Sequence, residues 1–302
     1  MSVYAITGAT GFVGAATLDE ALDAGHQVRA LTRKPQGPRE GVEWVAGTLS
    51  DESALVELCQ GADAVIHIAG LTNTPDPALF ETANVTGTAN AIAAAKAAKV
   101  KRFVFVSSLS AREPDLSLYG ASKARAEELV QASGLDWTIV RPPAVYGPRD
   151  NDMFELFRSA RFGLVPLPPK GATSIIHVSD LARLLLALAG RKGLKTIYEP
   201  DDGREGGWSH KEMGQAIGRA VGKSSVLALN LPAGVLKVAA KADKLLRGDK
   251  AKLTADRVGY MLHPNWVARS DRAVPLDIWQ PQIGGEEGLK QTAQWYEAEG
   301  WY

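Results

Sequence analysis

Short apolar segments and longer helical segments alternate strictly over the first half of the chain. The apolar segments have the composition of β-strands and contain few charges: VYAIT, QVRALT, AVIHIA, RFVFVS and WTIVRP. The segments between them have helical composition: ATLDEALDAG, ESALVELCQ, TANAIAAAKAA and LYGASKARAE. Such alternation implies parallel strands joined by crossover helices, and strands that are apolar throughout are covered on both faces. The sequence therefore predicts an α/β fold built on a doubly wound parallel sheet.

The pattern changes after Pro148. A Pro-rich segment, GLVPLPPKG, precedes an apolar helix at 181–190 and a last strand-like segment at 196–200. Five of the seven tryptophans then follow beyond residue 200. We therefore expect residues 1–150 and 171–200 to form the sheet domain. Residues 151–170 and 201–302 are expected to form a smaller helical, Trp-rich lobe that covers the substrate.

The segment TGATGFVG at residues 7–14 lies directly between the first strand and the first helix. Glycines at this place let the backbone turn tightly and approach a pyrophosphate, whose charge is met by the N–H groups and dipole of the helix N-terminus. The motif in this context predicts a Rossmann-type domain that binds a dinucleotide. The residues expected to contact it are Gly8, Thr10, Gly11, Phe12, Val13 and Gly14.

The end of the second strand indicates which dinucleotide binds. An NAD-binding protein usually has a carboxylate there for the adenosine ribose. This chain has the uncharged Thr32 followed by Arg33 and Lys34. Cations at this position can accept a 2′-phosphate, and the planar fork of an arginine suits it well. We therefore expect NADP(H) to be preferred, with NAD(H) as the alternative.

Tyr119 and Lys123 stand four residues apart at the start of a predicted helix. Residues at i and i+4 are neighbours on a helix surface, so the phenol and the ammonium can reach a common point. A free phenol has a pKa of about 10 and is a poor base at neutral pH. A nearby cation would favour the phenolate, so the pair is a candidate catalytic acid/base with its activating charge.

Taken together, the motifs resemble the extended branch of the short-chain dehydrogenase/reductase superfamily, which contains NAD(P)-dependent epimerases, dehydratases and reductases. The resemblance covers the first half and reaches the C-terminal GLKQTAQWYEAEGW. The motifs that carry it are TGATGFVG, VIHIAG at 65–70, NVTG at 84–87, VSS at 106–108, YGASK at 119–123, RPPAVYGP at 141–148 and IHVSDLA at 176–182.

The resemblance implies roles for the matching residues. Ser108 would hydrogen-bond the reacting oxygen, Tyr119 would be the general acid/base, and Lys123 would hold the nicotinamide ribose and lower the pKa of the tyrosine. Asn84 matches an asparagine in the helix behind the site. Thr48 stands where the family commonly has an aspartate beside the adenine, so the cofactor role carries over to this place only weakly, to Leu49 and the nearby Asp51, and Thr48 itself is kept as a candidate. Further cofactor-lining residues implied in this way are Ile68, Ala69, Gly70, Val106, Pro142 and Val145.

Three functions remain open. Tyr119 follows Ser108 by only 11 residues, whereas sugar-nucleotide enzymes of this branch typically carry a longer loop there. Leu109 follows Ser108 where dehydratase chemistry needs an acid. With the apolar segment FGLVPLPP in the substrate lobe, this favours an NADP-dependent reductase or dehydrogenase acting on a small-molecule ketone or secondary alcohol. A sugar-nucleotide epimerase is the alternative, and a non-catalytic NADP-binding regulator or scaffold is the least favoured hypothesis. Family habit suggests a homodimer.

Composition limits the remaining classes. The 34 basic and 34 acidic residues cancel, which argues against a nucleic-acid partner. With Cys59 as the single cysteine, no intramolecular disulfide and no multi-cysteine zinc site can form, and no metal site is expected. No signal-peptide pattern opens the sequence, and its most apolar run is about half the length that spans a bilayer. We therefore expect a cytoplasmic protein without an integral membrane segment.

The segment 231–252, LPAGVLKVAAKADKLLRGDKAK, is a basic amphipathic helix candidate. We favour an interpretation in which solvated lysines cover a Val/Leu/Ala face that packs on the core. Attachment of this helix to a membrane surface, or to a partner, is the alternative.

Overall fold

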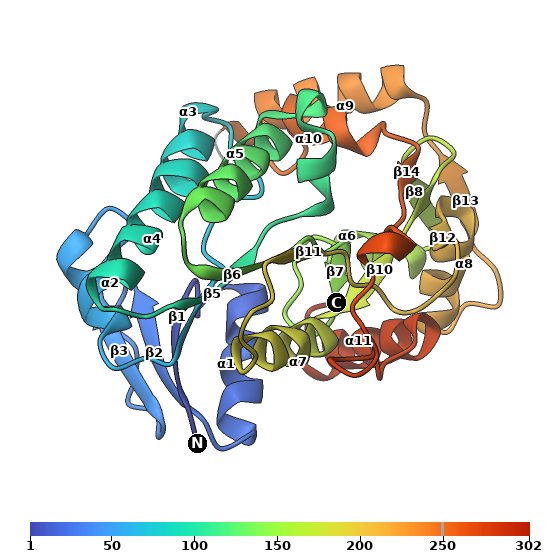
Figure 1. Ribbon diagram of the computed structural model, residues 1–302. Helices are drawn as coiled ribbons and strands as arrows, with labels where there is room; N and C mark the ends of the chain where they lie inside the picture. Colours follow the sequence, from blue (N-terminus) through green and yellow to red (C-terminus); the bar gives the residue numbers. More distant parts are fainter. Residues whose placement is uncertain (249–250) are drawn as a thin grey trace.

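The computed structural model describes residues 1–248 and 251–302, and its centre is a seven-stranded sheet with helices on both faces (Figure 1). From one edge to the other the strands are β11 (Thr196–Tyr198), β6 (Asp136–Val140), β5 (Arg102–Val106), β4 (Ala64–His67), β1 (Val3–Thr7), β2 (Gln27–Thr32) and β3 (Val42–Ala46). Every neighbouring pair in this sheet is parallel. The predicted doubly wound sheet is confirmed. Its strand order reverses between β1 and β4, and ligands bind outside the carboxyl ends of strands at such a point.

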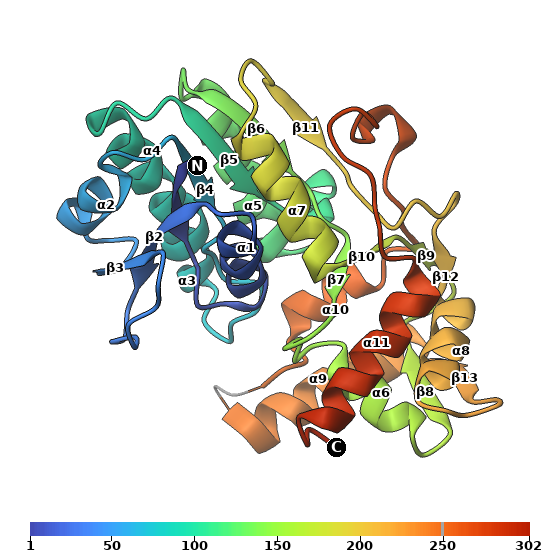
Figure 2. The same cartoon turned by 90° about the horizontal axis from the view of Figure 1, so that it is seen from below.

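Helices α1 (Phe12–Asp23) and α7 (Val178–Ala189) cover one face of the sheet, which Figure 2 shows from below. The opposite face carries α2 (Glu52–Cys59), α4 (Gly87–Ala97) and α5 (Leu118–Ala132) (Figure 1). Strand side chains alternate between the two cores. Ile6 and Ile66 pack with α1 and α7, whereas Val65, Phe103 and Phe105 pack with the other layer. Burial on both faces explains why these strands are apolar throughout.

One strand of the sheet is absent from the predicted alternation. β3 lies at the edge, where only Val45 of its five residues is buried and Glu43 is exposed. An edge strand of this kind does not show the continuous apolar signal of the central strands.

The second half of the chain builds a lobe of short strands and helices, shown at the right of Figure 1. β8 pairs with β13, β9 lies between β12 and β14, and β10 pairs with β7. The strands of the lobe and its junction are β7 (Ala144–Tyr146), β8 (Leu164–Leu167), β9 (Ala172–Thr173), β10 (Ile175–His177), β12 (Trp208–Ser209), β13 (Leu227–Asn230) and β14 (Asn265–Trp266). The helices are α6 (Phe154–Ala160), α8 (His210–Ala220), α9 (Ala233–Arg247), α10 (Ala255–Met261), η5 (Ser270–Arg272) and α11 (Gly285–Ala298).

The tryptophans of this region take part in packing. Trp208 is buried and donates a hydrogen bond to Asp202 Oδ2 at 2.8 Å. Trp295 and Trp301 surround the fully buried Tyr296. A helical, Trp-containing C-terminal region is therefore confirmed.

The predicted division into two domains stays a prediction, and two segments lie across it. Val274 and Trp279 pack with the sheet core beside α7, although they fall in the predicted lobe. Tyr146 and Ile175 pack in the core of the lobe, although they fall in the predicted sheet domain.

Helix α9 differs from the interpretation that its Val/Leu/Ala face packs on the core. Leu236 and Ala240 are buried, but Val238, Leu245 and Leu246 are exposed. The reason is that α9 packs on α10, so it buries one narrow stripe. Residues 249–250 of the predicted basic segment lie outside the described residues. Within the rest of the chain, no helix combines the length and the apolarity needed to cross a membrane.

Candidate functional site

The glycine loop joins β1 to α1 in a conformation that needs glycine at two positions. Gly8 has φ +78, and a Cβ there would lie 2.7 Å from Ala69 N. A Cβ on Gly14 would overlap the carbonyl oxygen of Gly8. Gly11 is the N-cap of α1, where no side chain caps the helix and the first turn has no acidic residue. The positive end of the helix therefore faces the switch point without a protein anion, as binding of a pyrophosphate requires.

A chain of hydrogen bonds ties the loop to the end of β4. Thr7 Oγ1 accepts from Ala69 N at 3.3 Å and lies 2.7 Å from His67 Nδ1. On the other side of the ring, His67 Nε2 lies 3.0 Å from Thr88 Oγ1, which donates to Asn84 O at 2.6 Å. Burial and then the charge of a nearby lysine lower the pKa of His67 to about 3. The ring is thus neutral and holds two strand ends in place.

Asn84 connects the segment after β4 to α5. Its Oδ1 accepts from Leu71 N at 2.7 Å, and its Nδ2 donates to Leu71 O and to Ser122 Oγ, both at 2.9 Å. Asn84 lies in a π-helical turn, η1 (Glu81–Thr86), which follows the short α3 (Ala78–Phe80). Position 70 favours glycine because a Cβ there would lie only 2.8 Å from Asn84 Oδ1. Asn84 is therefore a positioning residue for the backbone at 70–71.

Ser108, Tyr119 and Lys123 gather beyond the carboxyl end of β5. Ser108 follows this strand and caps the 3₁₀-helix η2 (Leu109–Arg112), accepting from Ser110 N at 3.1 Å. A second 3₁₀-helix, η3 (Pro114–Leu116), leads to Ser117, which caps α5. Tyr119 and Lys123 are both buried in the first turns of α5. The structure thus brings the three predicted catalytic residues together, and their roles stay predictions.

Lys123 is a cation held in an almost dry environment. Its Nζ donates to Val106 O at 2.7 Å and lies 4.3 Å from the centre of the Phe105 ring. Burial lowers the pKa of the amine to about 7, and the negative charge of Glu127 acts in the opposite direction. The group can therefore exist charged or neutral near neutral pH.

Tyr119 departs from the expected activated phenol. Burial raises the pKa of its hydroxyl, and a side-chain hydrogen bond with Ser108 opposes the rise without cancelling it. Lys123 directs its ammonium to the Val106 carbonyl. In the chain alone burial therefore favours the protonated phenol, and the hydrogen bond with Ser108 opposes it only in part.

A buried ionic network supports α5 and was not foreseen from the sequence. Glu127 binds Arg141 through two hydrogen bonds of 2.6 and 2.9 Å and also accepts from Ser107 Oγ. Arg141 reaches Glu199 at 3.4 Å, and Glu199 also binds Arg112 at 3.2 Å. The one sequence signal for this network is that Glu127 stands four residues after Lys123 on the same helix.

Helix α10 covers the N-terminus of α5 and was likewise missed. Asp256 accepts from Leu118 N at 2.6 Å and from Tyr119 N at 3.3 Å. The rings of Tyr260 and Phe80 lie with their centres 6.1 Å from that of Tyr119. The Tyr119 ring therefore neighbours two aromatic side chains, one from the lobe and one from the sheet domain.

The end of β2 carries exposed cations. Thr32 is buried, and its Oγ1 donates to Lys34 O at 2.7 Å, which fixes the turn. Arg33 and Lys34 are exposed. A cavity of about 470 Å³ lies beside the glycine loop, between Thr10 and the segment after β2, and its lining includes Arg39 and Arg149. Those two arginines, which the sequence did not single out, both bind Asp19.

The remaining predicted cofactor residues lie after β3 and near the carboxyl ends of other strands. Leu49 packs against Gly87, and its carbonyl accepts from Asn90 Nδ2 at 2.8 Å. Thr48 is exposed. Three more lie near the carboxyl ends of the sheet strands: Ile68 after β4, Pro142 after β6 and Val145 in β7.

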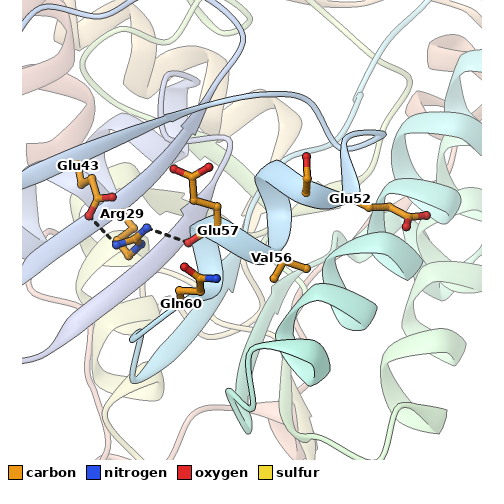
Figure 3. A pocket seen from close by; sticks show the side chains of 7 residues that line it. Arg29, Glu43, Glu52, Val56, Glu57 and Gln60 are labelled. Atoms are coloured by element: carbon orange, nitrogen blue, oxygen red, sulfur yellow. Dashed lines mark hydrogen bonds and ion pairs between the residues drawn. The ribbon is translucent and has the colours of Figure 1, made fainter.

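A wider groove of about 860 Å³ lies on the opposite face of the sheet, between β2, β3 and α2 (Figure 3). Its arginine, Arg29, is already bound to Glu43 at 2.6 Å and to the carbonyl of Glu57 at 2.8 Å. The groove contains none of the predicted site residues, so it is not the candidate site.

Within residues 1–248 and 251–302, no group of three or more His, Cys, Asp or Glu could hold a metal ion.

Comparison with known proteins agrees with a dinucleotide-binding domain. The profile of a family described as NAD(P)H-binding matches residues 8–190. The chain is 36% identical over 309 residues to a protein named ceramide reductase from Caulobacter vibrioides, covering 99% of this chain and 96% of that protein. It is 32% identical over 330 residues to a 2-alkyl-3-oxoalkanoate reductase from Stenotrophomonas maltophilia, covering 95% and 97%.

The solved structure of a UDP-N-acetylglucosamine 4-epimerase from Bacillus cereus has a TM-score of 0.74 to this chain at 19% identity, with 97% and 99% covered. At that identity the likeness shows the fold alone. The glycine loop, the parallel sheet and the two relatives that match over almost their whole length lead to one conclusion. The chain belongs to the family described as NAD(P)H-binding and is an NAD(P)-dependent oxidoreductase of the extended short-chain dehydrogenase/reductase type.

Proposed function

We propose that this protein is an NADPH-dependent reductase of a ketone carried on a long alkyl chain. The observation that carries the proposal is a buried Tyr119 that gathers with Ser108 and Lys123 and has the rings of Tyr260 and Phe80 centred 6.1 Å from its own. Burial raises the pKa of the Tyr119 hydroxyl and so favours its protonated form. A protonated phenol is the form that donates a proton to a carbonyl oxygen, as ketone reduction requires.

In the proposed reaction the reduced nicotinamide, when bound, supplies a hydride to the carbonyl carbon. Ser108 holds the carbonyl oxygen by a hydrogen bond, and Tyr119 donates its hydroxyl proton to that oxygen as the alcohol forms. The phenolate that remains is stabilised by the nearby Lys123 and then takes a proton from solvent. The N-terminus of α1 holds the pyrophosphate.

Three features support an apolar substrate over a sugar nucleotide. The connection from Ser108 to Tyr119 consists of two short 3₁₀-helices, without an inserted loop. Two aromatic side chains, Phe80 and Tyr260, have ring centres 6.1 Å from that of Tyr119. The two relatives that match over almost their whole length are named for a ceramide and for a 2-alkyl-3-oxoalkanoate, compounds with long alkyl chains.

A substrate panel tests the proposal. NADPH oxidation would be followed by nicotinamide absorbance with 3-oxoalkanoates of increasing chain length, 3-oxo lipid amides and sugar nucleotides. We expect turnover that increases with chain length and falls about 10²- to 10⁴-fold in Tyr119→Phe, while NADPH binding is retained. Epimerisation of a sugar nucleotide without net NADPH consumption, or full turnover in Tyr119→Phe, would overturn it.

The preference for NADPH is part of the proposal and has its own test. The exposed Arg33 at the end of β2 is available for a 2′-phosphate, and no carboxylate stands at that place. Arg33→Ala should weaken NADPH binding about tenfold or more and leave NADH binding nearly unchanged. Arg158→Ala, which removes an exposed arginine of α6, is the matched control. Equal losses for both cofactors would refute the assignment.

A further inference from the structure

Helix α9 exposes a continuous apolar stripe. Val235, Val238, Leu245 and Leu246 have exposed fractions of 48%, 68%, 87% and 83%. With Ala242, which is also exposed, they follow the spacing i, i+3, i+7, i+10 and i+11, so they lie on one face of the helix. Large apolar side chains exposed together in this way mark a surface that contacts a partner or a membrane.

A row of lysines runs beside this stripe. Lys237, Lys241 and Lys244 are exposed at i, i+4 and i+7, so they also share one face. At about 100° per residue this face adjoins the apolar stripe on the side of Val238 and Leu245. The third face of the helix is the buried one, where Leu236 and Ala240 pack on α10.

The acidic residue of α9 does not offset these lysines. Asp243 binds Arg247 at 3.3 Å and accepts from the backbone N–H groups of Lys252 and Leu253, both at 2.8 Å. Its carboxylate is therefore engaged at the buried side of the helix. The surface formed by the apolar stripe and the lysine row, called here the α9 surface, is complementary to a surface that is apolar inside and anionic outside.

The α9 surface lies close to the candidate site. α9 packs on α10, and α10 supplies both Asp256, which binds the first turn of α5, and Tyr260, which neighbours Tyr119. In both views α9 forms an outer edge of the molecule (Figures 1 and 2).

We propose that α9 docks this protein on an anionic lipid membrane. The apolar stripe enters the boundary between head groups and acyl chains, while the lysine row binds the anionic head groups. The docking is inferred from the faces of α9 alone. Its use would be to present an alkyl-chain ketone to the site beneath α10, and this part rests on the proposed function. A second copy of the chain fits less well, because two antiparallel α9 surfaces face to face would bring their lysine rows onto the same side.

Co-sedimentation of the full chain with lipid vesicles tests the docking. We expect binding to vesicles that mix phosphatidylglycerol with phosphatidylcholine, weak binding to phosphatidylcholine alone, and weaker binding at high salt. Lys237→Gln, Lys241→Gln and Lys244→Gln should each reduce binding to the anionic vesicles about fivefold. The double variant Leu245→Glu/Leu246→Glu should reduce it about 10- to 100-fold.

Controls separate the docking from folding and from the reaction. Leu276→Glu introduces the same change at an apolar residue that is 78% exposed outside α9, and should bind vesicles as the wild type does. NADPH oxidation with a short, water-soluble 3-oxoalkanoate should be unchanged in every variant. Vesicle binding without any reductase activity would contradict the proposed function and support the docking.

Three results would overturn the docking. One is the absence of wild-type binding to anionic vesicles. The second is equal binding by the double leucine variant. The third is a dimer in solution that dissociates in the double leucine variant while vesicles are not bound, which would make the α9 surface a contact between two copies.

Discussion

Replacing Lys123 with methionine should abolish activity and yet stabilise the fold at neutral pH. Burial lowers the pKa of this amine from 10.5 to about 7. At about 1.36 kcal/mol per pKa unit, that difference means that burying the ammonium at pH 7 costs about 5 kcal/mol. Methionine removes this cost but also removes the charged hydrogen bond to Val106 O, worth about 2–3 kcal/mol. The net expectation is a gain of about 2 kcal/mol in the free energy of unfolding.

The dependence on pH identifies the cause of this gain. Between about pH 7 and pH 10.5 the unfolded chain keeps the proton on Lys123, whereas the folded chain has lost it. The unfolded state therefore binds more protons in this window, and this group makes the wild type more stable as the pH rises through it. Lys123→Met lacks that contribution, so its advantage at pH 7 should shrink as the pH approaches 10.

Thermal melts of both proteins at several pH values give the measurement. A gain of about 2 kcal/mol should raise the Tm by a few degrees at pH 7. Lys290→Met is the control, because it replaces an exposed lysine in a helix. A variant less stable than the wild type at pH 7, or an advantage independent of pH, would show that the buried amine does not bear this desolvation cost.

Three further predictions concern the groups around the site. Glu127→Gln should lower the free energy of unfolding by about 3 kcal/mol, since it removes the charge of a buried carboxylate and weakens its pair with the partly buried Arg141. The exposed neighbour Glu128→Gln should have almost no effect in the same urea titration. Asn84→Ala removes three hydrogen bonds, so it should lower the midpoint of urea unfolding and raise the KM for NADPH. An unchanged KM would contradict the positioning role of Asn84. Gly259→Ala would place a Cβ against the carbonyl oxygen of Leu116, so protease sensitivity at α10 should rise; unchanged sensitivity would mean that α10 tolerates the shift.

The parts of the site that could be predicted are those fixed by local backbone geometry. The glycine loop stands where a strand turns directly into a helix, and Gly8 and Gly14 meet contacts there that exclude a side chain. Tyr119 and Lys123 lie on one helix, so their spacing alone places them together. The central strands can be recognised in the sequence as continuous apolar segments, because both faces of these strands are buried.

The parts that could not be predicted depend on contacts between distant segments. Asp256 and Tyr260 reach the site because α10 packs against α5, and no local pattern after residue 200 indicates this. Glu199 binds Arg112 and Arg141 across long sequence separations. A pair of opposite charges is visible in a sequence, but its burial is a property of the assembled layers.

The pKa of Tyr119 could not be foreseen for a related reason. Sequence reasoning counts the cation four residues away, yet the balance is decided by burial, to which α10 contributes through Tyr260. Burial disfavours both the phenolate of Tyr119 and the ammonium of Lys123, so the site resists forming the phenolate in the chain alone. On the proposed function, a bound cofactor and substrate would supply the charge beside Tyr119 that makes proton donation favourable. On the proposed function, the same burial that makes Lys123 destabilising favours the protonated form of Tyr119 that ketone reduction would need.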